Sequence, residues 1–178
     1  MPRALYLRPL AVTVGLFISV AAPSGLAAAG LNFAADGQTA ATACVDYLAG
    51  KAPQAALAKA GFSTIKNKRH RQVYRKTKDG GGLPVFLQLV VSHKRSDASA
   101  RQCSASTTLT TEREAQTVYN AFMQAFSSGG YRSVKKKTAA GRNDLYLVGP
   151  HGTYKATAAY ASPLVPSLNL SITPVTTK

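Results

Sequence analysis

The chain has 178 residues and carries 22 Lys and Arg against 7 Asp and Glu, which gives a formal net charge of +15. Its two cysteines, three histidines and seven carboxylates are scattered, without the spacings of a zinc site or of a paired-carboxylate hydrolase. We therefore expect no metal and no cofactor. The charge excess predicts an anionic partner and good solubility, and it says nothing about the fold.

Residues 1–29 have the layout of a secretory signal peptide. Arg3 and Arg8 supply a basic start, residues 10–22 are largely apolar, and Ala27 to Ala29 offer small residues for cleavage. The apolar run is short against the roughly 20 residues that span a bilayer. We expect an exported protein, periplasmic or secreted, whose residues 30–178 form a single domain with a net charge of +13.

The first half of that domain begins with small residues. After an extended lead-in over residues 31–38, Thr39 or Thr42 can cap a helix that ends near Ala49. A second helical segment is expected over residues 53–60, with proline in its first turn. Because the inward positions are mostly alanine, the pattern predicts a tightly packed helix pair or one bent helix.

Strands follow in the first half. The run VFLQLVV at residues 85–91 is apolar on both alternating faces, which is typical of a central, well-buried strand. A turn is expected at residues 79–82 (Asp-Gly-Gly-Gly) and a polar loop at residues 92–100. The predicted strands are residues 65–71, 72–78, 85–91 and 103–109.

The second half opens with a clear helix start. Thr111 and Glu114 have the spacing of a capping box, and apolar residues follow at helical intervals until Gly129 and Gly130. Turn residues then separate four further strand patterns. These predicted strands are residues 131–137, 144–148, 153–161 and 168–173.

One stretch recurs between the halves. Residues 61–68 (GFSTIKNK) match residues 130–137 (GYRSVKKK) in their glycine, aromatic, β-branched and lysine positions. Each copy follows a predicted helix and begins a predicted strand. We therefore expect an α+β fold: a single pseudo-symmetric domain of two helix-then-four-strand halves, about 39–110 and 111–178, forming an antiparallel sheet with two helices packed on it.

Cys44 and Cys103 allow only one pairing. In an exported protein the expected state is a disulfide, which would tie the first helix to the strand before the second helix. Closing a loop of that length should stabilise the fold by on the order of 4 kcal/mol. The alternative is a catalytic thiol with a histidine base, which the oxidising compartment disfavours.

Clustered cations are the main candidate site. They could bind an anionic lipid, a polysaccharide, nucleic acid or an acidic protein, and Tyr74 and His70 could stack on bases if the ligand were single-stranded nucleic acid. The alternative is that these lysines lie on edge strands and prevent edge-to-edge pairing. The candidate anion-binding residues are Lys66, Lys68, Arg69, Arg71, Arg75, Lys76, Lys78, Lys135, Lys136 and Lys137.

Catalytic patterns are weak. Ser-x-x-Lys occurs at Ser63 and at Ser133, but both copies begin strands, where residues three apart point to opposite sides. A triad from Ser92, His93 and Asp97 would lack a nucleophile elbow. We therefore expect a non-enzymatic exported protein that binds an anionic envelope component or an acidic partner. The alternatives are a hydrolase with a hidden serine or histidine site, and a structural or inhibitory partner protein.

Overall fold

A computed structural model describes residues 30–78, 84–138, 143–161 and 165–175. The predicted signal peptide at residues 1–29 and the predicted turn at residues 79–82 lie outside these ranges, and both stay predictions. No helix in the described part of the chain is long and apolar enough to cross a membrane.

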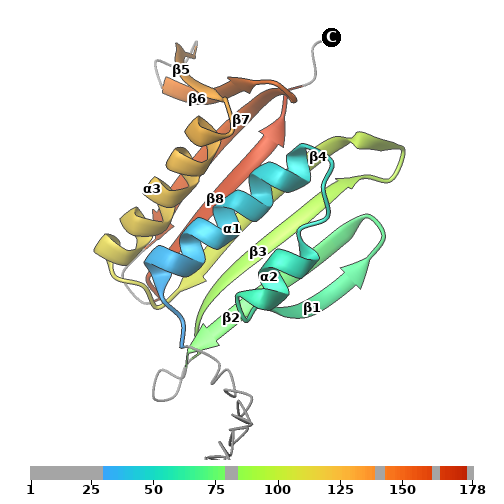
Figure 1. The fold of residues 1–178 in the computed structure, drawn as a ribbon. Helices are drawn as coiled ribbons and strands as arrows, with labels where there is room; N and C mark the ends of the chain where they lie inside the picture. The colour runs from blue at the N-terminus through green and yellow to red at the C-terminus, as the bar shows by residue number, and fades with distance from the viewer. Residues whose placement is uncertain (1–29, 79–83, 139–142, 162–164, 176–178) are drawn as a thin grey trace, which may run out of the picture.

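Eight strands form one antiparallel sheet in the order β1-β2-β3-β4-β8-β7-β6-β5 (Figure 1). Each half of the chain supplies four adjacent strands, and the two sets meet where β4 pairs with β8, with Cys103 opposite Ile172. The mirrored order makes the sheet pseudo-symmetric, as predicted. The strands are β1 (Ser63–Lys68), β2 (Arg71–Lys78), β3 (Val85–Lys94), β4 (Asp97–Thr108), β5 (Arg132–Lys137), β6 (Asn143–Gly149), β7 (Gly152–Ala161) and β8 (Ser167–Pro174).

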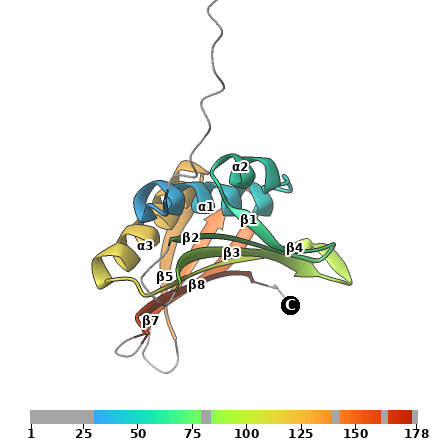
Figure 2. The ribbon, with the colours of Figure 1, turned by 90° about the horizontal axis from the view of Figure 1, so that it is seen from below.

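The helices α1 (Phe33–Leu48), α2 (Gln54–Lys59) and α3 (Glu112–Ser128) all pack on one face of this sheet. Figure 2 shows them on one side and the other side of the sheet uncovered. The predicted α+β class is therefore confirmed, with the first-half helix realised as the separate segments α1 and α2. We call the uncovered side the open face.

Small residues bring α1 close to its neighbours. Ala40 and Ala41 are fully buried, and a Cβ built on Gly37 would lie 3.5 Å from the Cα of Val118 on α3. Cys44, on the same buried side, forms the predicted disulfide with Cys103 of β4, with 5.9 Å between the two Cα atoms. The disulfide fixes α1 on the sheet at the point where the two halves meet.

The repeated stretch forms the same helix ending twice. The backbone N–H of Phe62 donates to the carbonyl of Leu57 at 2.9 Å, and that of Tyr131 donates to the carbonyl of Phe126 at 3.0 Å. Gly61 and its counterpart, residue 130, have φ values of +84° and +82°, a conformation that favours glycine. Both endings are Schellman motifs, in which a buried apolar pair closes the last turn.

Because the motif ends α2 in one half and α3 in the other, α2 is the counterpart of the last turns of α3. The pseudo-symmetry that relates the two halves of the sheet does not relate α1 to α3. Gly37 of α1 faces Val118 of α3, and Val45 faces Gly129 just after α3, so the two helices run parallel. The antiparallel pairing of β4 with β8 would instead make symmetry-related helices antiparallel. α1 is therefore an addition to the first half, laid beside α3.

The start of α1 corrects the sequence prediction. The helix begins at Phe33 rather than at Thr39 or Thr42, so the predicted extended lead-in over residues 31–38 is wrong. The Asn32 side chain caps it by accepting from the N–H groups of Ala34 and Ala35. Alanine, glycine and aspartate make up the buried side of this first part, so the sequence shows no hydrophobic period.

Residues 92–100 correct a second prediction. They are not a loop, because β3 continues to Lys94 and β4 already begins at Asp97, leaving a tight hairpin between them. The prediction of a strand buried on both faces is also wrong for β3. Leu87 and Leu89 are fully buried under the helices, while Phe86 and Val90, on the open face, are only half-buried.

Candidate anion-binding surface

The register of the sheet decides which face each predicted cation occupies, because residues paired across strands share a face. Arg71 and Arg75 pair with Ser92 and Gln88, on the side of β3 away from the helices. Lys66 and Lys68 pair with Val73 and Arg71, so they share this face. Four of the seven candidate cations between residues 66 and 78 therefore lie on the open face. These are Lys66, Lys68, Arg71 and Arg75.

Lys76 lies on the helix side and is part of the fold. Its Nζ donates to Asp36 Oδ1 at 2.8 Å and to the Ala60 carbonyl at 2.9 Å, and its side chain is only 11% exposed. Lys78 lies opposite Val85 on the same side. Neither residue points to the open face, so neither belongs to the candidate anion-binding surface there.

The candidate cations of the second half, at residues 135–137, are likewise divided between the two faces of the sheet. Lys136 lies opposite Asp144 on the open face, where its Nζ is 5.2 Å from the centre of the Tyr146 ring. Arg132, four residues earlier on the strand, is on this face as well and exposed. Lys135 and Lys137 alternate with them and face the helix side.

The two runs do not converge. β1 and β5 are the opposite edges of the sheet, seven strand spacings apart. At roughly 4.8 Å per spacing, the clusters lie on the order of 30 Å from each other along the sheet. A small anion cannot contact both clusters, whereas an extended anionic molecule that crosses the strands can.

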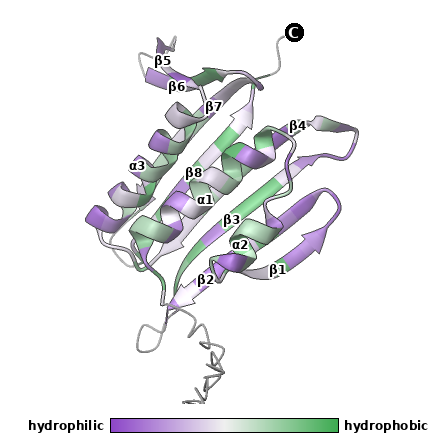
Figure 3. Cartoon of the chain, in the orientation of Figure 1, coloured by the Kyte–Doolittle hydropathy of each residue, from purple (hydrophilic) through white to green (hydrophobic). Residues whose placement is uncertain are grey.

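The edge positions also agree with the alternative interpretation. All six residues of β1 are exposed, as expected for an edge strand, and lysines on β1 and β5 hinder pairing with another sheet. Edge protection does not account for Arg71 and Arg75, because β2 is an interior strand. Figure 3 shows the mainly hydrophilic colouring of β1 at the edge and the largely apolar β3, with β2 between them.

Carboxylates are distributed unevenly between the faces. Asp144 is the one described carboxylate that the register places on the open face, and it is paired with Lys155 at 2.5 Å. Four others belong to the helices, and Asp97 is at the tip of the β3–β4 hairpin. Lys155 therefore adds no net charge to the open face. The helix carboxylates are Asp36, Asp46, Glu112 and Glu114.

A shallow hollow of about 450 Å³ lies in the middle of the open face, between the two clusters. Two cation–aromatic contacts flank it: the Arg75 guanidinium lies 4.5 Å from the centre of the Phe86 ring, and Lys136 approaches Tyr146. Apart from Arg71, the polar side chains lining the hollow are hydroxyls and amides, which can hydrogen-bond to a ligand without adding charge. These are Gln88, Ser104, Ser106, Thr157, Asn169 and Ser171.

The stacking residues suggested by the sequence are not both available. Tyr74 is only 1% exposed, faces the helices and donates its hydroxyl hydrogen to Gln72 Oε1 at 2.9 Å. It cannot stack on a bound base, and this part of the prediction is wrong. His70 lies in the turn between β1 and β2 among several cations.

A second hollow, of about 210 Å³, opens at the corner where this turn meets α1 and the β3–β4 hairpin. Arg69, Arg71 and Arg101 line it together with His93 and Tyr47. The sequence indicated two of these arginines but missed Arg101. The disulfide pairing could have located it, because Tyr47 follows Cys44 by one helical turn and Arg101 precedes Cys103 by two strand positions.

Neither the Ser-x-x-Lys pattern nor the possible triad forms an assembled catalytic site among the described residues. Ser92 and His93 are neighbours on a strand and point to opposite faces, while Asp97 accepts from Ser99. A β-bulge between Thr64 and Lys66 places Lys66 on the same face as Ser63, which corrects the expected opposite orientation. Both side chains are exposed on the edge strand.

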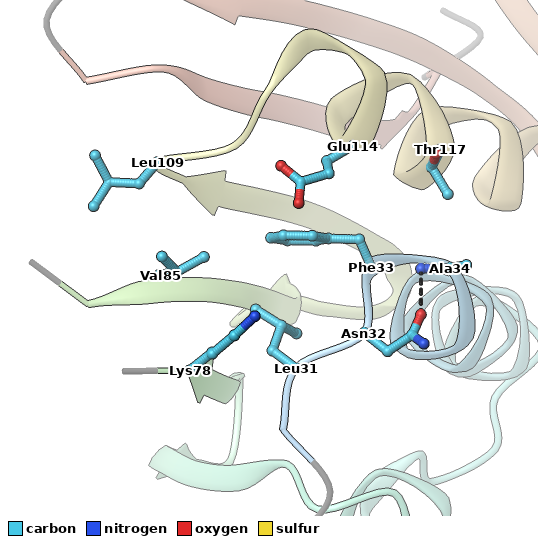
Figure 4. Close-up of a pocket in the computed structure, with 9 residues that line it drawn as sticks. All are labelled: Leu31, Asn32, Phe33, Ala34, Lys78, Val85, Leu109, Glu114 and Thr117. Atoms are coloured by element: carbon cyan, nitrogen blue, oxygen red, sulfur yellow. Dashed lines mark hydrogen bonds between the residues drawn. The ribbon is translucent and has the colours of Figure 1, made fainter. Parts of the chain in front are cut away.

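A third hollow, of about 580 Å³, lies at the N-terminal ends of α1 and α3 (Figure 4). Its lining combines Phe33 and Leu109 with one cation, Lys78, and one carboxylate, Glu114. Glu114 is occupied by the capping box of α3, as predicted. With balanced charge and an apolar lining, this hollow offers nothing specific to an anion.

No group of three or more potential metal ligands is found within the described ranges. In comparisons with known proteins, no family model, curated protein or solved structure matches the chain.

Proposed function

We propose that this is an exported, non-enzymatic binding protein that holds an extended anionic partner, such as an envelope polymer, against the open face of its sheet. The observation that carries this proposal is the charge of that face: Lys66, Lys68, Arg71, Arg75, Arg132 and Lys136 have no carboxylate partner among the described residues. The predicted signal peptide supports the location.

The arrangement favours a polymer over a small ligand. The clusters lie at the two ends of the open face, and the hollow between them has Arg71 on its lining and otherwise only neutral hydrogen-bonding and apolar groups. A chain of phosphates, sulfates or carboxylates that crosses the strands can meet cations at both ends, and its uncharged parts can lie over the hollow. Each neutralised charge on such a polymer releases counterions, so binding should weaken steeply with salt.

Retention on a heparin column, measured as the salt concentration at elution, tests the proposal. We expect Lys66→Gln with Lys68→Gln, and separately Arg132→Gln with Lys136→Gln, to lower the elution salt, and the four changes together to lower it further. The matched control is Lys59→Gln with Arg113→Gln, which removes the same charge from exposed positions on the helices.

The control should elute close to the unmodified protein. Equal losses in the control and in the open-face variants would mean that net charge alone causes retention, and the proposal would fail. Elution that is insensitive to salt would also overturn it. Circular dichroism of each variant establishes that the fold is retained.

A further inference from the structure

The corner hollow brings two arginine side chains together from separate elements. Arg69 comes from the β1–β2 turn and Arg101 from β4, and both line the same 210 Å³ space; Arg71 borders it too, but its pairing with Ser92 places its side chain on the open face. None of them is in an ion pair with a described carboxylate. Like charges brought together in this way repel one another, and an anion bound between them would remove that repulsion.

The surrounding contacts hold these groups in place. The N–H of His93 donates to the carbonyl of His70 at 3.1 Å, which fastens the turn carrying Arg69 to the end of β3. The guanidinium of Arg101 lies over Gly50, where a built Cβ would be 3.6 Å from its Nη1, and 6.0 Å from the centre of the Tyr47 ring. The arginine from β4 is therefore positioned by α1.

His93 offers a further ligand atom. The Tyr47 hydroxyl is bonded to its Nδ1 at 3.1 Å, which leaves Nε2 as the ring nitrogen that can meet a ligand. Lys51 is at the rim of the hollow, but Asp46 binds its Nζ at 2.9 Å, so it adds little positive charge. The unopposed charge in the hollow thus comes from guanidinium groups.

Size and chemistry indicate the ligand class. Sites for whole drug-sized molecules enclose about 300–1,000 Å³, so this smaller hollow suits a single charged group. Guanidinium forks match the oxygen spacing of phosphate and bind it through paired hydrogen bonds. We propose that the corner hollow is a binding site for one phosphate group, held by Arg69 and Arg101 with His93 and Tyr47 beside them.

This site deepens the proposed function, since a phosphate-bearing polymer on the open face could place one group here, and Arg71 lines both hollows. The phosphate could be free or esterified, and both share the same chemistry. Titration with inorganic phosphate, glycerol 3-phosphate and glucose 6-phosphate at constant ionic strength distinguishes these sources. Binding is followed by the NMR signals of the His93 imidazole.

We expect saturable binding of all three probes, with tighter binding of an ester if the natural group is attached to glycerol or sugar. Arg69→Gln with Arg101→Gln should weaken binding at least tenfold, and Tyr47→Phe should weaken it only modestly because the ring under Arg101 remains. The control is again Lys59→Gln with Arg113→Gln, which should bind like the unmodified protein.

Absence of saturation with every probe would overturn the site, and so would equal affinities in the arginine variant and the control. These results separate the two proposals, because the heparin variants change no residue that lines the corner hollow. If the phosphate titration fails while heparin retention still depends on Lys66 and Lys136, the corner-site proposal alone is wrong. If phosphate binds while heparin retention no longer depends on these lysines, the open-face proposal alone is wrong.

Discussion

Tyr131 follows the second of the two repeated glycines, and its side chain is buried where the halves are most alike. Its ring packs edge-on against Phe126, with 5.1 Å between centroids, and against Tyr154 at 6.0 Å. It also lies so close to Gly149 that a Cβ there would be 2.3 Å from its Cδ1. Phe62, the equivalent residue in the first half, needs no polar partner.

The hydroxyl of Tyr131 is buried without a partner in good hydrogen-bond geometry among the described residues, and burial raises the pKa of Tyr131 to about 12 against a smaller opposing effect of the nearby His151 backbone. We expect Tyr131→Phe to raise the free energy of unfolding by about 1 kcal/mol, because the variant no longer buries an unsatisfied group. Denaturant unfolding measures the change.

Tyr154→Phe is the matched comparison, since the Tyr154 hydroxyl donates to the His151 carbonyl at 3.0 Å. Losing that hydrogen bond should lower stability by about 1 kcal/mol. If both variants were destabilised equally, the hydroxyl of Tyr131 would have a partner, and the interpretation of its burial would be wrong.

At the scale of elements, the added helix α1 is joined to the rest of the fold by two cross-links of different chemistry. The disulfide connects its later part to β4, and the ion pair between Asp36 and Lys76 connects its first turn to β2. Lys76 also reaches the Ala60 carbonyl at the end of α2. One buried ammonium group therefore joins three elements.

We expect Lys76→Met to lower the free energy of unfolding by about 3 kcal/mol, because it leaves the Asp36 carboxylate buried without its cation. The double variant Asp36→Asn with Lys76→Met should recover part of the loss. Denaturant unfolding of both proteins is the measurement, and Lys68→Met, on the exposed edge strand, should change stability by less than about 0.5 kcal/mol. Equal effects at the two lysines would contradict the structural role of Lys76.

Across the whole molecule, the buried ion pair of Asp36 and Lys76 lies under the helices, and groups of unpaired cations lie on the open face and at the corner. Other cations, such as Lys135 and Lys137, remain on the helix side. The pKa of His70 is sensitive to the electrostatic field of the nearby cations. Local desolvation and the charges of Arg95, Lys68, His93 and Lys66 lower the pKa of His70 from its ordinary value.

Because folding lowers the pKa of His70, the unfolded chain binds the proton more readily than the folded chain. The contribution of neutral His70 to stability is therefore complete above the ordinary pKa of about 6.5, and it declines as the pH falls below that value. We expect the NMR titration of His70 to give a pKa below 6.5 in low salt. High salt or bound heparin should move the pKa upward by screening the cations. A pKa that does not respond to either would show that these cations do not act on His70.

Much of the fold was predictable from local patterns. The helix endings at Gly61 and Gly130 and the capping box of α3 are where they were predicted, and five of the eight strands begin and end within one residue of their predicted bounds, because each depends on a few adjacent residues. The start of α1 and the β3–β4 hairpin were not. Small and polar residues there form regular structure only because α3 and the neighbouring strands pack against them.

The amino-acid sequence was enough to predict a pseudo-symmetric α+β domain with one disulfide and two basic stretches, since glycine conformation, capping and cysteine count are local properties. The positions of the charges, in contrast, follow from the three-dimensional fold. The strand order places the two basic stretches at opposite edges of the sheet, and the register divides each of them between the two faces. The packing of α1 against the sheet places Arg69 and Arg101 on the same corner hollow. These arrangements depend on pairings between distant segments, which the local sequence does not specify.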